Sequence, residues 1–168
     1  MIPNIALENI YFRESGVNDL DLLYRIYAST REPEMQLLTQ WDEAMKQQFV
    51  MQQFLAQDKF YHEANPAADF LIILIGDVPA GRLYCIQREG NLHIIDISLL
   101  PEFRNKGYGS IVLRHMQEIS KEGSMSLTIR VEKFNPAKSL YERLGFRALE
   151  DDGSLYLGMR WTHHGLQK

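Results

Sequence analysis

The sequence predicts an α/β fold in which helices cover the faces of one mixed sheet. Three observations support this prediction. Apolar residues at helical spacing follow a short first strand, three extended runs joined by tight turns occupy the middle of the chain, and helical and extended segments alternate after them. The predicted element order is β-α-α-β-β-β-α-β-α-β-β. The 168 residues fit a single domain spanning 1–168.

The first third of the chain is predicted to contain one strand and two helices. Residues 5–13 are typical of a strand, and Asn18 or Asp19 can cap the helix that follows. A break is expected at residues 31–34, because their proline disfavours a helical conformation in the residue before it. Thr39 would cap the second helix. The expected apolar stripe of that helix is Trp41, Met45, Phe49 and Phe54, and Asn65-Pro66 would end it.

An antiparallel meander of three strands is predicted next, followed by alternating helices and strands. Turns at GDVPAG and at Glu89-Gly90-Asn91 separate the strands of the meander. The predicted ranges are strands at 70–75, 82–87 and 92–100, a helix ending near Lys121, a strand at 126–131, a helix at 137–144, and strands at 146–149 and 154–161.

Composition excludes several classes of function. The net charge is −4, so the chain lacks the basic footprint that nucleic-acid binding usually leaves. No run reaches the roughly 20 apolar residues of a membrane helix, and no signal peptide is evident, so no membrane association and a cytoplasmic location are expected. Cys85 is the only cysteine and is expected to be a buried structural thiol, with no metal site. The oligomeric state is not readable, and a homodimer stays open.

The stretch LLPEFRNKGYGS, residues 99–110, joins a predicted strand to a predicted helix. A strand that enters a helix through glycines presents unpaired backbone N–H groups at the positive end of the helix, which favours an anion. Arg104 and Lys106 add positive charge beside the two glycines. A Walker loop is excluded because the lysine precedes the glycine. A dinucleotide fingerprint is excluded because Val112 stands where a third glycine is needed.

Two segments carry a resemblance to a known family. Residues 97–110, ISLLPEFRNKGYGS, resemble the acetyl-CoA signature of the GNAT N-acetyltransferase superfamily, with Arg104, Gly107 and Gly109 in its characteristic places. Residues 135–146, NPAKSLYERLGF, resemble the second hallmark of the family. The resemblance implies the GNAT acyl-CoA N-acyltransferase fold, acetyl-CoA as co-substrate, and transfer of its acetyl group to a primary amine.

The resemblance also implies roles for individual residues. The strand around Leu99 would separate from the next strand and hydrogen-bond the pantetheine arm, a backbone N–H near Leu99 would polarise the thioester carbonyl, and the loop amides would hold the pyrophosphate. Tyr141 would protonate the leaving thiolate. Asn135 is one residue closer to Tyr141 than in many members, which leaves open whether it binds the pantetheine or caps its helix. The implied cofactor-binding residues are Ile97, Ser98, Leu99, Arg104, Asn105, Lys106, Gly107, Tyr108, Gly109, Ser110 and Asn135.

The general base is left open among three candidates. Family members often use a glutamate on the strand before the phosphate loop, but residues 92–100 contain none. His93 titrates near neutrality and can take the proton, or it is a strand-end histidine without a chemical role. Asp96 is either the base or a structural partner of a helix residue, and water is the third candidate. Strand alternation predicts His93 on the same face as Ile97 and Leu99, with Asp96 on the other face.

The acceptor pocket is expected in residues 14–65, the region that varies most within the family. Tyr27, Arg31 and Trp41 are predicted to bind the substrate, and the Arg31 guanidinium could clamp a substrate carboxylate. Further candidates near the helix ends are Tyr24, Glu34 and Asp42.

The predicted reaction is direct acetyl transfer in a ternary complex, without a covalent enzyme intermediate or a metal ion. The acceptor, a small-molecule or peptide amine, is not identified by the sequence. A catalytically silent acyl-CoA-binding module of the same fold is the alternative.

Overall fold

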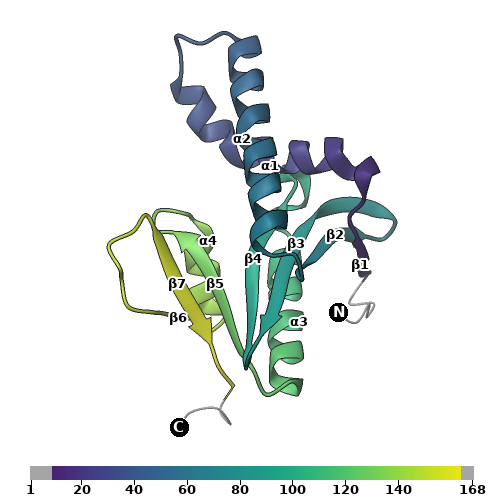
Figure 1. Ribbon diagram of the computed structural model, residues 1–168, viewed down its shortest axis with the longest axis vertical. Helices are drawn as coiled ribbons and strands as arrows, with labels where there is room; N and C mark the ends of the chain where they lie inside the picture. The colour runs from purple at the N-terminus through teal and green to yellow at the C-terminus, as the bar shows by residue number, and fades with distance from the viewer. Residues whose placement is uncertain (1–8, 164–168) are drawn as a thin grey trace.

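The computed structural model describes residues 9–163, and within that range the chain forms seven strands and four helices (Figure 1). The strands are β1 (Ile10–Glu14), β2 (Asp69–Ile75), β3 (Val78–Arg88), β4 (Asn91–Leu99), β5 (Ser126–Glu132), β6 (Arg147–Ala148) and β7 (Tyr156–Trp161). The helices are α1 (Leu20–Leu37), α2 (Glu43–Ala64), α3 (Tyr108–Glu122) and α4 (Ala137–Arg143). Short 3-10 turns at Val17–Asp19 and Pro101–Phe103 precede α1 and α3.

All of these strands belong to one mixed sheet. Their order across it is β1-β2-β3-β4-β5-β7-β6. β4 and β5 run parallel, whereas the other neighbours are antiparallel. The predicted element order and the β2-β3-β4 meander are confirmed. Residues 5–8 of the predicted first strand lie outside the described range.

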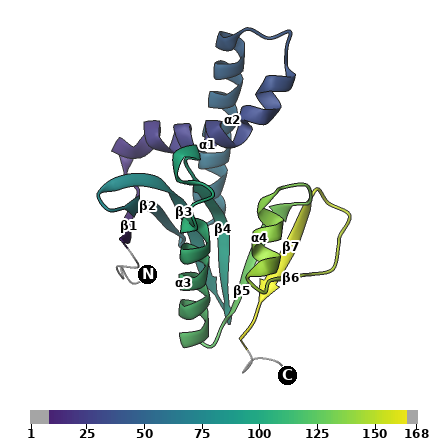
Figure 2. The ribbon, with the colours of Figure 1, turned by 180° about the vertical axis from the view of Figure 1, so that it is seen from behind.

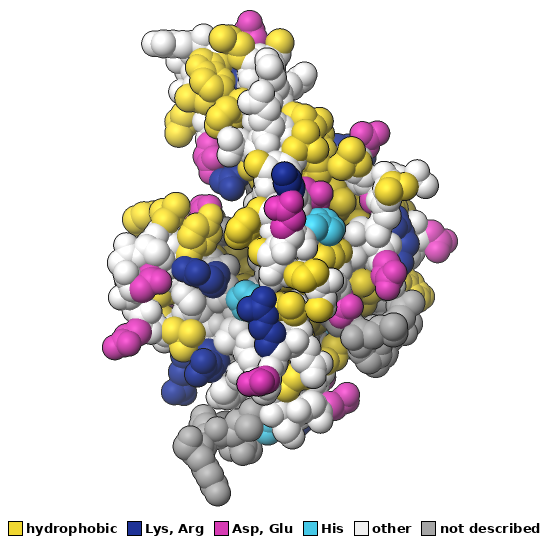
Figure 3. Space-filling view, in the orientation of Figure 1, with side chains coloured by type: hydrophobic (Ala, Val, Ile, Leu, Met, Phe, Trp, Pro, Cys, Tyr) yellow, Lys and Arg dark blue, Asp and Glu magenta, His cyan; other side chains and the backbone are white. Residues whose placement is uncertain are grey.

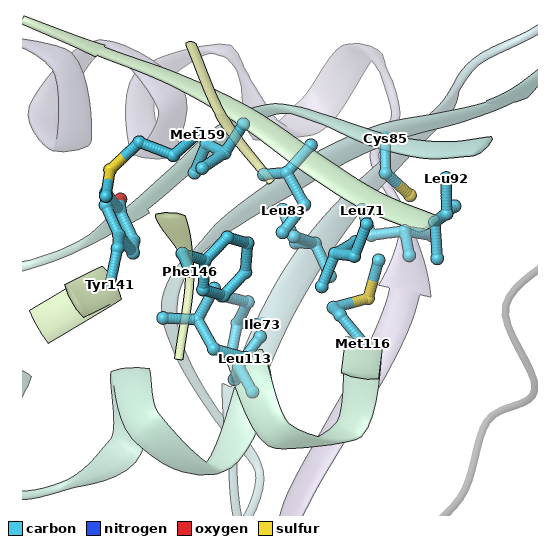
Figure 4. Packing of buried hydrophobic residues seen from close by; sticks show 14 of the residues in the cluster. Leu71, Ile73, Leu83, Cys85, Leu92, Leu113, Met116, Tyr141, Phe146 and Met159 are labelled. Carbon is cyan, nitrogen blue, oxygen red and sulfur yellow. The ribbon is translucent and has the colours of Figure 1, made fainter. Parts of the chain in front are cut away.

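Helices cover both faces of the sheet. α1 and α2 lie on one face and α3 and α4 on the other, as the two opposite views show (Figures 1 and 2). The α3-side core contains Leu113 and Met116 of α3 packed against strand residues (Figure 4). The α2-side core contains Phe54 of α2 against Tyr84 of β3, both fully buried. No helix between residues 9 and 163 is long and apolar enough to span a membrane.

The break predicted at residues 31–34 is wrong, because α1 continues through Pro33 to Leu37. Pro33 is exposed, so its ring does not disturb the contact of the helix with the sheet. The turn beyond it is held by Met35, which packs against the α2-side core. These contacts offset the helix-interior cost of proline, about 3 kcal/mol.

The second helix begins later than predicted and buries a different face. Asp42, not Thr39, is its cap, and the Asp42 carboxylate accepts a hydrogen bond from the backbone N–H of Met45 at 2.8 Å. Phe54 is buried as expected, but the Met45 and Phe49 side chains are 53% and 37% exposed. α2 carries apolar side chains on several sides, so their spacing alone does not identify the face that meets the sheet.

The two halves of the sheet separate between β4 and β5. These strands pair only where Asn91–Ile94 lie beside Ser126–Ile129. Among residues 9–163, nothing pairs with residues 95–99 of β4 or residues 130–132 of β5 on the sides that face each other. The space between these two segments is called the gap below, and the separation predicted around Leu99 is present there (Figure 1).

A β-bulge in β4 lies where the gap begins. Tyr84 of β3 pairs with Asp96, whereas the next residue, Cys85, pairs with Ile94. Ile95 is therefore an extra residue without a counterpart in β3, and it packs against the α2-side core. One inserted residue shifts the alternation of all side chains beyond it.

The bulge makes the predicted face of His93 wrong. Ile97 and Leu99 pack against the α3-side core, as do the residues on either side of His93. His93 therefore points to the opposite, α2 face, where the Asp96 carboxylate also lies among side chains of α2 and β3. Both protein candidates for the base thus lie on one face of β4.

Candidate active site

The loop between β4 and α3 presents a row of unpaired backbone amides. None of the N–H groups from Asn105 to Ser110 donates a hydrogen bond to another group among residues 9–163. The first bonded amide of α3 is that of Ile111, which donates to the carbonyl of Gly107 at 3.1 Å. Asn105 and Gly107 have φ values of 58° and 87°, a left-handed backbone that turns successive amides toward one side. Open donors at the start of a helix form an anion site that suits a pyrophosphate.

Arg104 and Lys106 flank this loop in different ways. The Arg104 guanidinium donates from Nε to the Leu99 carbonyl at 2.8 Å and from Nη2 to Ser29 Oγ at 2.7 Å. Arg104 therefore ties the loop to the end of β4 and to α1, and its cofactor contact stays a prediction. Lys106 is exposed and makes no hydrogen bond or ion pair within the described range, so its charge is available beside the amides.

The edge of β4 that faces the gap carries free backbone groups. The amide of Leu100 donates to the carbonyl of Ala80 in β3 at 2.8 Å. Because N–H groups alternate in direction along a strand, the amides of Ile97 and Leu99 point away from β3 and into the gap. No strand meets them there, since the pairing with β5 ends at Ile94. An extended ligand arm can therefore bind along this edge, and the Leu99 amide can polarise a carbonyl.

Tyr141 lies on α4, which packs against β5. Its side chain is 5% exposed and contacts Phe146, with Met159 beside it (Figure 4). Burial raises the pKa of Tyr141, and the negative charge of Asp96 raises it further. The phenol therefore stays protonated at neutral pH and can act as an acid.

Asn135 has the geometry of a helix cap. Its Oδ1 accepts a hydrogen bond from the backbone N–H of Ala137 at 2.9 Å, and its carbonyl accepts one from Lys138 at 3.0 Å. Of the two roles that the sequence leaves open, the cap is thus observed. A contact with the pantetheine stays a prediction.

A buried ion pair joins β3 to β4 on the α2 side of the gap. Arg82 is 2% exposed and donates to both carboxylate oxygens of Asp96, from Nη2 at 2.9 Å and from Nε at 3.3 Å. Nη2 also donates to Gln57 Oε1 at 2.8 Å, and the guanidinium lies 5.0 Å from the centre of the Tyr84 ring. Asp96 is therefore a structural partner, as one sequence alternative holds, but chiefly of a strand residue.

Asp96 has further donors around it. Ser98 Oγ donates to Oδ1 at 2.8 Å, and the Tyr61 hydroxyl donates to Oδ2 at 3.5 Å. Each carboxylate oxygen of Asp96 thus accepts two hydrogen bonds. The carboxylate is held in one orientation at the start of the gap.

His93 lies beside the hydroxyl of Thr128 in β5. Its Nδ1 is 2.9 Å from Thr128 Oγ1, which also accepts a hydrogen bond from Asn91 Nδ2 at 2.8 Å. Burial lowers the pKa of His93, and the charges of Arg88 and Arg130 lower it further. The imidazole is therefore neutral at neutral pH, the form that accepts a proton.

Five side chains from four elements form a cluster that joins α1 and α2 to the β5–β7 half of the sheet, and they are called the acceptor wall. Its members are Tyr27 and Arg31 of α1, Tyr61 of α2, Glu132 of β5 and Tyr156 of β7. Tyr27 is its buried member. The Arg31 guanidinium lies 5.4 Å from the centre of the Tyr27 ring and 3.8 Å from Glu132. The Tyr156 hydroxyl donates to Glu132 at 3.3 Å. Two of the three predicted substrate-binding residues, Tyr27 and Arg31, are thus brought together.

Trp41, the third of them, is not brought to this wall. It lies in the connection between α1 and α2, at the end of the helical hairpin that projects from the sheet (Figure 1). There its ring meets the edge of Phe49, with centroids 5.4 Å apart.

The other acceptor candidates have local roles. Tyr24 lines an open groove between α1 and α2, and Asp42 caps α2. Glu34 holds Arg31 at 3.0 Å.

Two alternative chemistries find little support. Burial raises the pKa of the Cys85 thiol to about 12, so no thiolate forms at neutral pH. Within the described range, no group of three or more His, Cys, Asp and Glu side chains is placed to hold a metal ion.

Sequence reasoning missed four residues of this region: Tyr61, Arg82, Glu132 and Tyr156. An arginine within the apolar strand AGRLYCI needs a buried anionic partner, and Asp96 in the next strand is that partner, so this signal was readable. Glu132 and Tyr156 face each other only through the β5–β7 register, which no local pattern reveals.

Comparisons with known proteins identify the family of this chain. Residues 22–146 match the family model described as Acetyltransferase (GNAT) family. Streptothricin acetyltransferase of Streptomyces lavendulae is 38% identical over 69 residues, which are 40% of this chain and 36% of that protein. The uncharacterized N-acetyltransferase CgeE of Bacillus subtilis strain 168 is 31% identical over 74 residues, 44% of this chain and 29% of that protein. The chain thus matches about a third of the length of these relatives.

A solved structure has the same fold. It is the PaiA N-acetyltransferase of Thermoplasma acidophilum in complex with coenzyme A, which superposes with a TM-score of 0.65. The superposition covers 92% of this chain and 99% of that chain at 18% identity. At this identity the likeness concerns the fold alone.

Proposed function

Because the chain belongs to the GNAT acetyltransferase family, we propose that it transfers the acetyl group of acetyl-CoA to a primary amine by direct attack in a ternary complex. The observation that carries this proposal is the row of unpaired amides from Asn105 to Ser110. The 3-10 turn Pro101–Phe103, whose neighbouring amides are bonded, separates this row from the free edge of β4. Tyr141 lies within electrostatic reach of Asp96 on that strand.

The acetyl-CoA site extends along the loop and the strand. The amides of residues 105–110, with Lys106 beside them, bind the pyrophosphate. The pantetheine lies along the amides of Ile97 and Leu99, and the Leu99 amide stabilises the negative charge that develops on the thioester oxygen. Backbone groups dominate this site, so its affinity depends little on side-chain identity.

The reaction breaks the C–S bond of the thioester and forms a C–N bond. The neutral amine attacks the carbonyl carbon, and Tyr141 gives its phenolic proton to the departing sulfur. The proton that the amine loses passes to a base on the α2 face of β4. Tyr141 then regains its proton from solvent.

We propose His93 as the base, reached through a chain of waters, because it lies six residues before Leu99 on β4, roughly 15–20 Å along the strand from the proposed thioester carbonyl. Its pKa is lowered by burial, so it is neutral where the enzyme would work. In the tautomer whose Nδ1–H donates to Thr128, Nε2 carries the lone pair that accepts the proton. The oxygens of Asp96 already accept hydrogen bonds from Arg82, Ser98 and Tyr61, so a proton there would have to displace a donor.

The acceptor enters from the α2 face, past the acceptor wall. Small-molecule and peptide amines both suit an entrance lined by tyrosines and carboxylates. Streptothricin, which names the Streptomyces lavendulae relative, belongs in the panel of amines to be tested.

Release of free thiol from acetyl-CoA across a panel of amines tests the proposal. At least one amine should cause release, and Tyr141→Phe should lower kcat about a hundredfold with the Kd for CoA nearly unchanged. Tyr24→Phe, which removes a phenol outside the acceptor wall, should match the wild type. CoA binding without release for any amine would leave a silent acyl-CoA-binding module, and equal turnover of Tyr141→Phe would remove the tyrosine from the mechanism.

A further inference from the structure

The only ion pair across the open end of the gap, among residues 9–163, joins Arg31 to Glu132. Arg31 belongs to α1, which lies over the β1–β4 half of the sheet, and Glu132 is the last residue of β5 in the other half. Their side chains approach to 3.8 Å. The outline of the molecule is indented where the α1–α2 hairpin meets the β5–β7 half (Figure 3).

The surroundings of the Arg31 guanidinium are those of a cation-binding site. It lies 5.4 Å from the centre of the Tyr27 ring, between Glu34 at 3.0 Å and Glu132 at 3.8 Å. An aromatic face and carboxylates are the groups that hold ammonium and guanidinium ions. Burial alone would lower the pKa of Arg31, but the contacts with Tyr27 and Glu34 outweigh it and raise the pKa.

The two ion pairs beside the gap differ in how easily a ligand can open them. In the Arg82–Asp96 pair the side chains are 2% and 14% exposed. In the Arg31–Glu132 pair they are 27% and 33% exposed, and the contact is longer. An exposed ion pair is weak, because water screens it and two flexible side chains must be held. A cation that enters from solvent can therefore replace Arg31 on Glu132 but cannot replace Arg82 on Asp96.

Glu132 is connected to the reacting end of the gap through the acceptor wall. The Tyr156 hydroxyl donates to Glu132, and the Tyr61 hydroxyl donates to Asp96. Burial raises the pKa of Tyr61, and Asp96 and Tyr156 are among the groups that raise it further, so these two tyrosines lie close together. Tyr61 and Tyr156 thus link the surroundings of Asp96 to those of Glu132.

We propose that the acceptor carries a second cationic group, and that this group binds Glu132 in place of the Arg31 guanidinium while the reacting amine lies at the Asp96 end of the acceptor wall. This inference rests on the proposed function and names its substrate class, a diamine or polyamine-like cation. Arg31 then acts as a competitor for the subsite. A substrate carboxylate fits less well, because it would have to displace Glu34 and Glu132 from the guanidinium and meet their charges.

Paired amines of equal length test the inference. The probes are α,ω-diamines with three to eight methylene groups and the corresponding monoamines, assayed by thiol release from acetyl-CoA. The wild type should have the higher kcat/KM for diamines at one or more lengths. Glu132→Gln should lower the diamine-to-monoamine ratio of kcat/KM about tenfold, through a higher KM for diamines. Arg31→Met should raise the same ratio, because the internal competitor is removed.

Glu118→Gln is the matched control, since Glu118 is an exposed α3 residue whose one ion pair within the described range is with Lys121 at 3.6 Å. It should leave the ratio at the wild-type value. If the diamine-to-monoamine ratio of kcat/KM were unchanged in Glu132→Gln, or lowered in Arg31→Met, the proposed subsite would be overturned. The proposed acetyltransferase activity would not be affected by that result.

Binding separates this inference from the proposed function. Calorimetry of the diamines with the CoA-bound protein should show tighter binding to Arg31→Met and weaker binding to Glu132→Gln than to the wild type, whether or not acetyl transfer occurs. Thiol release from no amine would contradict the proposed function alone. Equal diamine affinity in all three proteins would contradict the subsite alone.

Discussion

The two sides of the gap are built from different parts of the chain. On the proposed cofactor side, the candidate binding groups are unpaired backbone amides within one stretch of sequence, residues 97–110. On the acceptor side, they are side chains of α1, α2, β5 and β7, and Tyr27 and Tyr156 stand 129 positions apart in the sequence (156 − 27). A site made of contiguous backbone is encoded locally, whereas a site made of distant side chains depends on how the elements pack.

The two sides also differ in charge. The cofactor side has open donors that await an anion, because the amides from Asn105 to Ser110 have no partner among the described residues. On the acceptor side, Asp96 and Glu132 are already matched by arginines of the chain. Removal of a side chain should therefore impair stability and binding more on the acceptor side than on the cofactor side. Addition of atoms should impair binding more on the cofactor side.

Loss of the Arg82 side chain should have the largest effect. Arg82→Met leaves the Asp96 carboxylate at 14% exposure without its cation, which should lower the free energy of unfolding by about 3–5 kcal/mol. Urea denaturation followed by circular dichroism measures this loss. The double variant Arg82→Met with Asp96→Leu should recover much of it, because no unpaired charge stays buried. A loss below about 1 kcal/mol in the single variant would mean that the pair is not the structural anchor of the acceptor side.

The sequence predicted the backbone of the β4–α3 loop well because its signals are local. Gly107 requires a left-handed backbone at φ 87°, and the glycines stand between an apolar strand and an amphipathic helix, so spacing alone identifies the loop. The capping role of Asn135 was likewise readable from the sequence, because a proline follows it. The hydrogen bond between Arg104 and Ser29 could not be predicted from local patterns, since Ser29 lies 75 positions earlier in the chain.

The sequence predicted the acceptor side poorly because non-local packing decides it. One extra residue, Ile95, reverses the face of His93 relative to Ile97, and no turn residue marks that bulge. Pro33 lies inside α1, where local preference argues for a break. Packing of Met35 against the α2-side core outweighs that preference, and the chain pattern carries no sign of it.

The pH dependence of turnover should sharpen the comparison through His93. The pKa of His93 is lowered from its ordinary value of about 6.5 by burial, so the base is neutral at pH 6.5 and above and is lost as pH falls below that. His93→Gln should lower kcat/KM about a hundredfold at neutral pH. The ionisation of the substrate amine affects both proteins equally, so it cancels in the ratio of the variant kcat/KM to the wild-type kcat/KM. This ratio should approach one at acid pH, where His93 of the wild type is protonated and no longer acts as a base. A ratio of one at every pH would leave water as the base.

The same residue makes a separate prediction for stability. A folded-state pKa below the unfolded value means that the unfolded chain binds the proton more tightly, so the wild type should lose stability as pH falls below about 6.5. His93→Gln should lose less stability over that range, measured by thermal unfolding at matched pH. This readout is independent of catalysis, so it tests the buried, neutral state of His93 even if the base is water.

The smallest effect is expected on the cofactor side, where added atoms should matter more than lost charge. A Cβ at Gly109 would lie 3.7 Å from Leu140 Cδ2 and 4.0 Å from Leu99 Cδ1, which is ordinary van der Waals contact, so Gly109→Val is expected to fold. The valine methyls should nevertheless keep phosphate oxygens from an amide, which weakens CoA binding about thirtyfold, the loss of one charge-assisted hydrogen bond of about 2 kcal/mol. Lys106→Ala removes only an exposed charge and should weaken binding about threefold, less at high salt. Calorimetry with CoA measures both, and a larger loss for Lys106→Ala than for Gly109→Val would mean that side-chain charge, not backbone, holds the pyrophosphate.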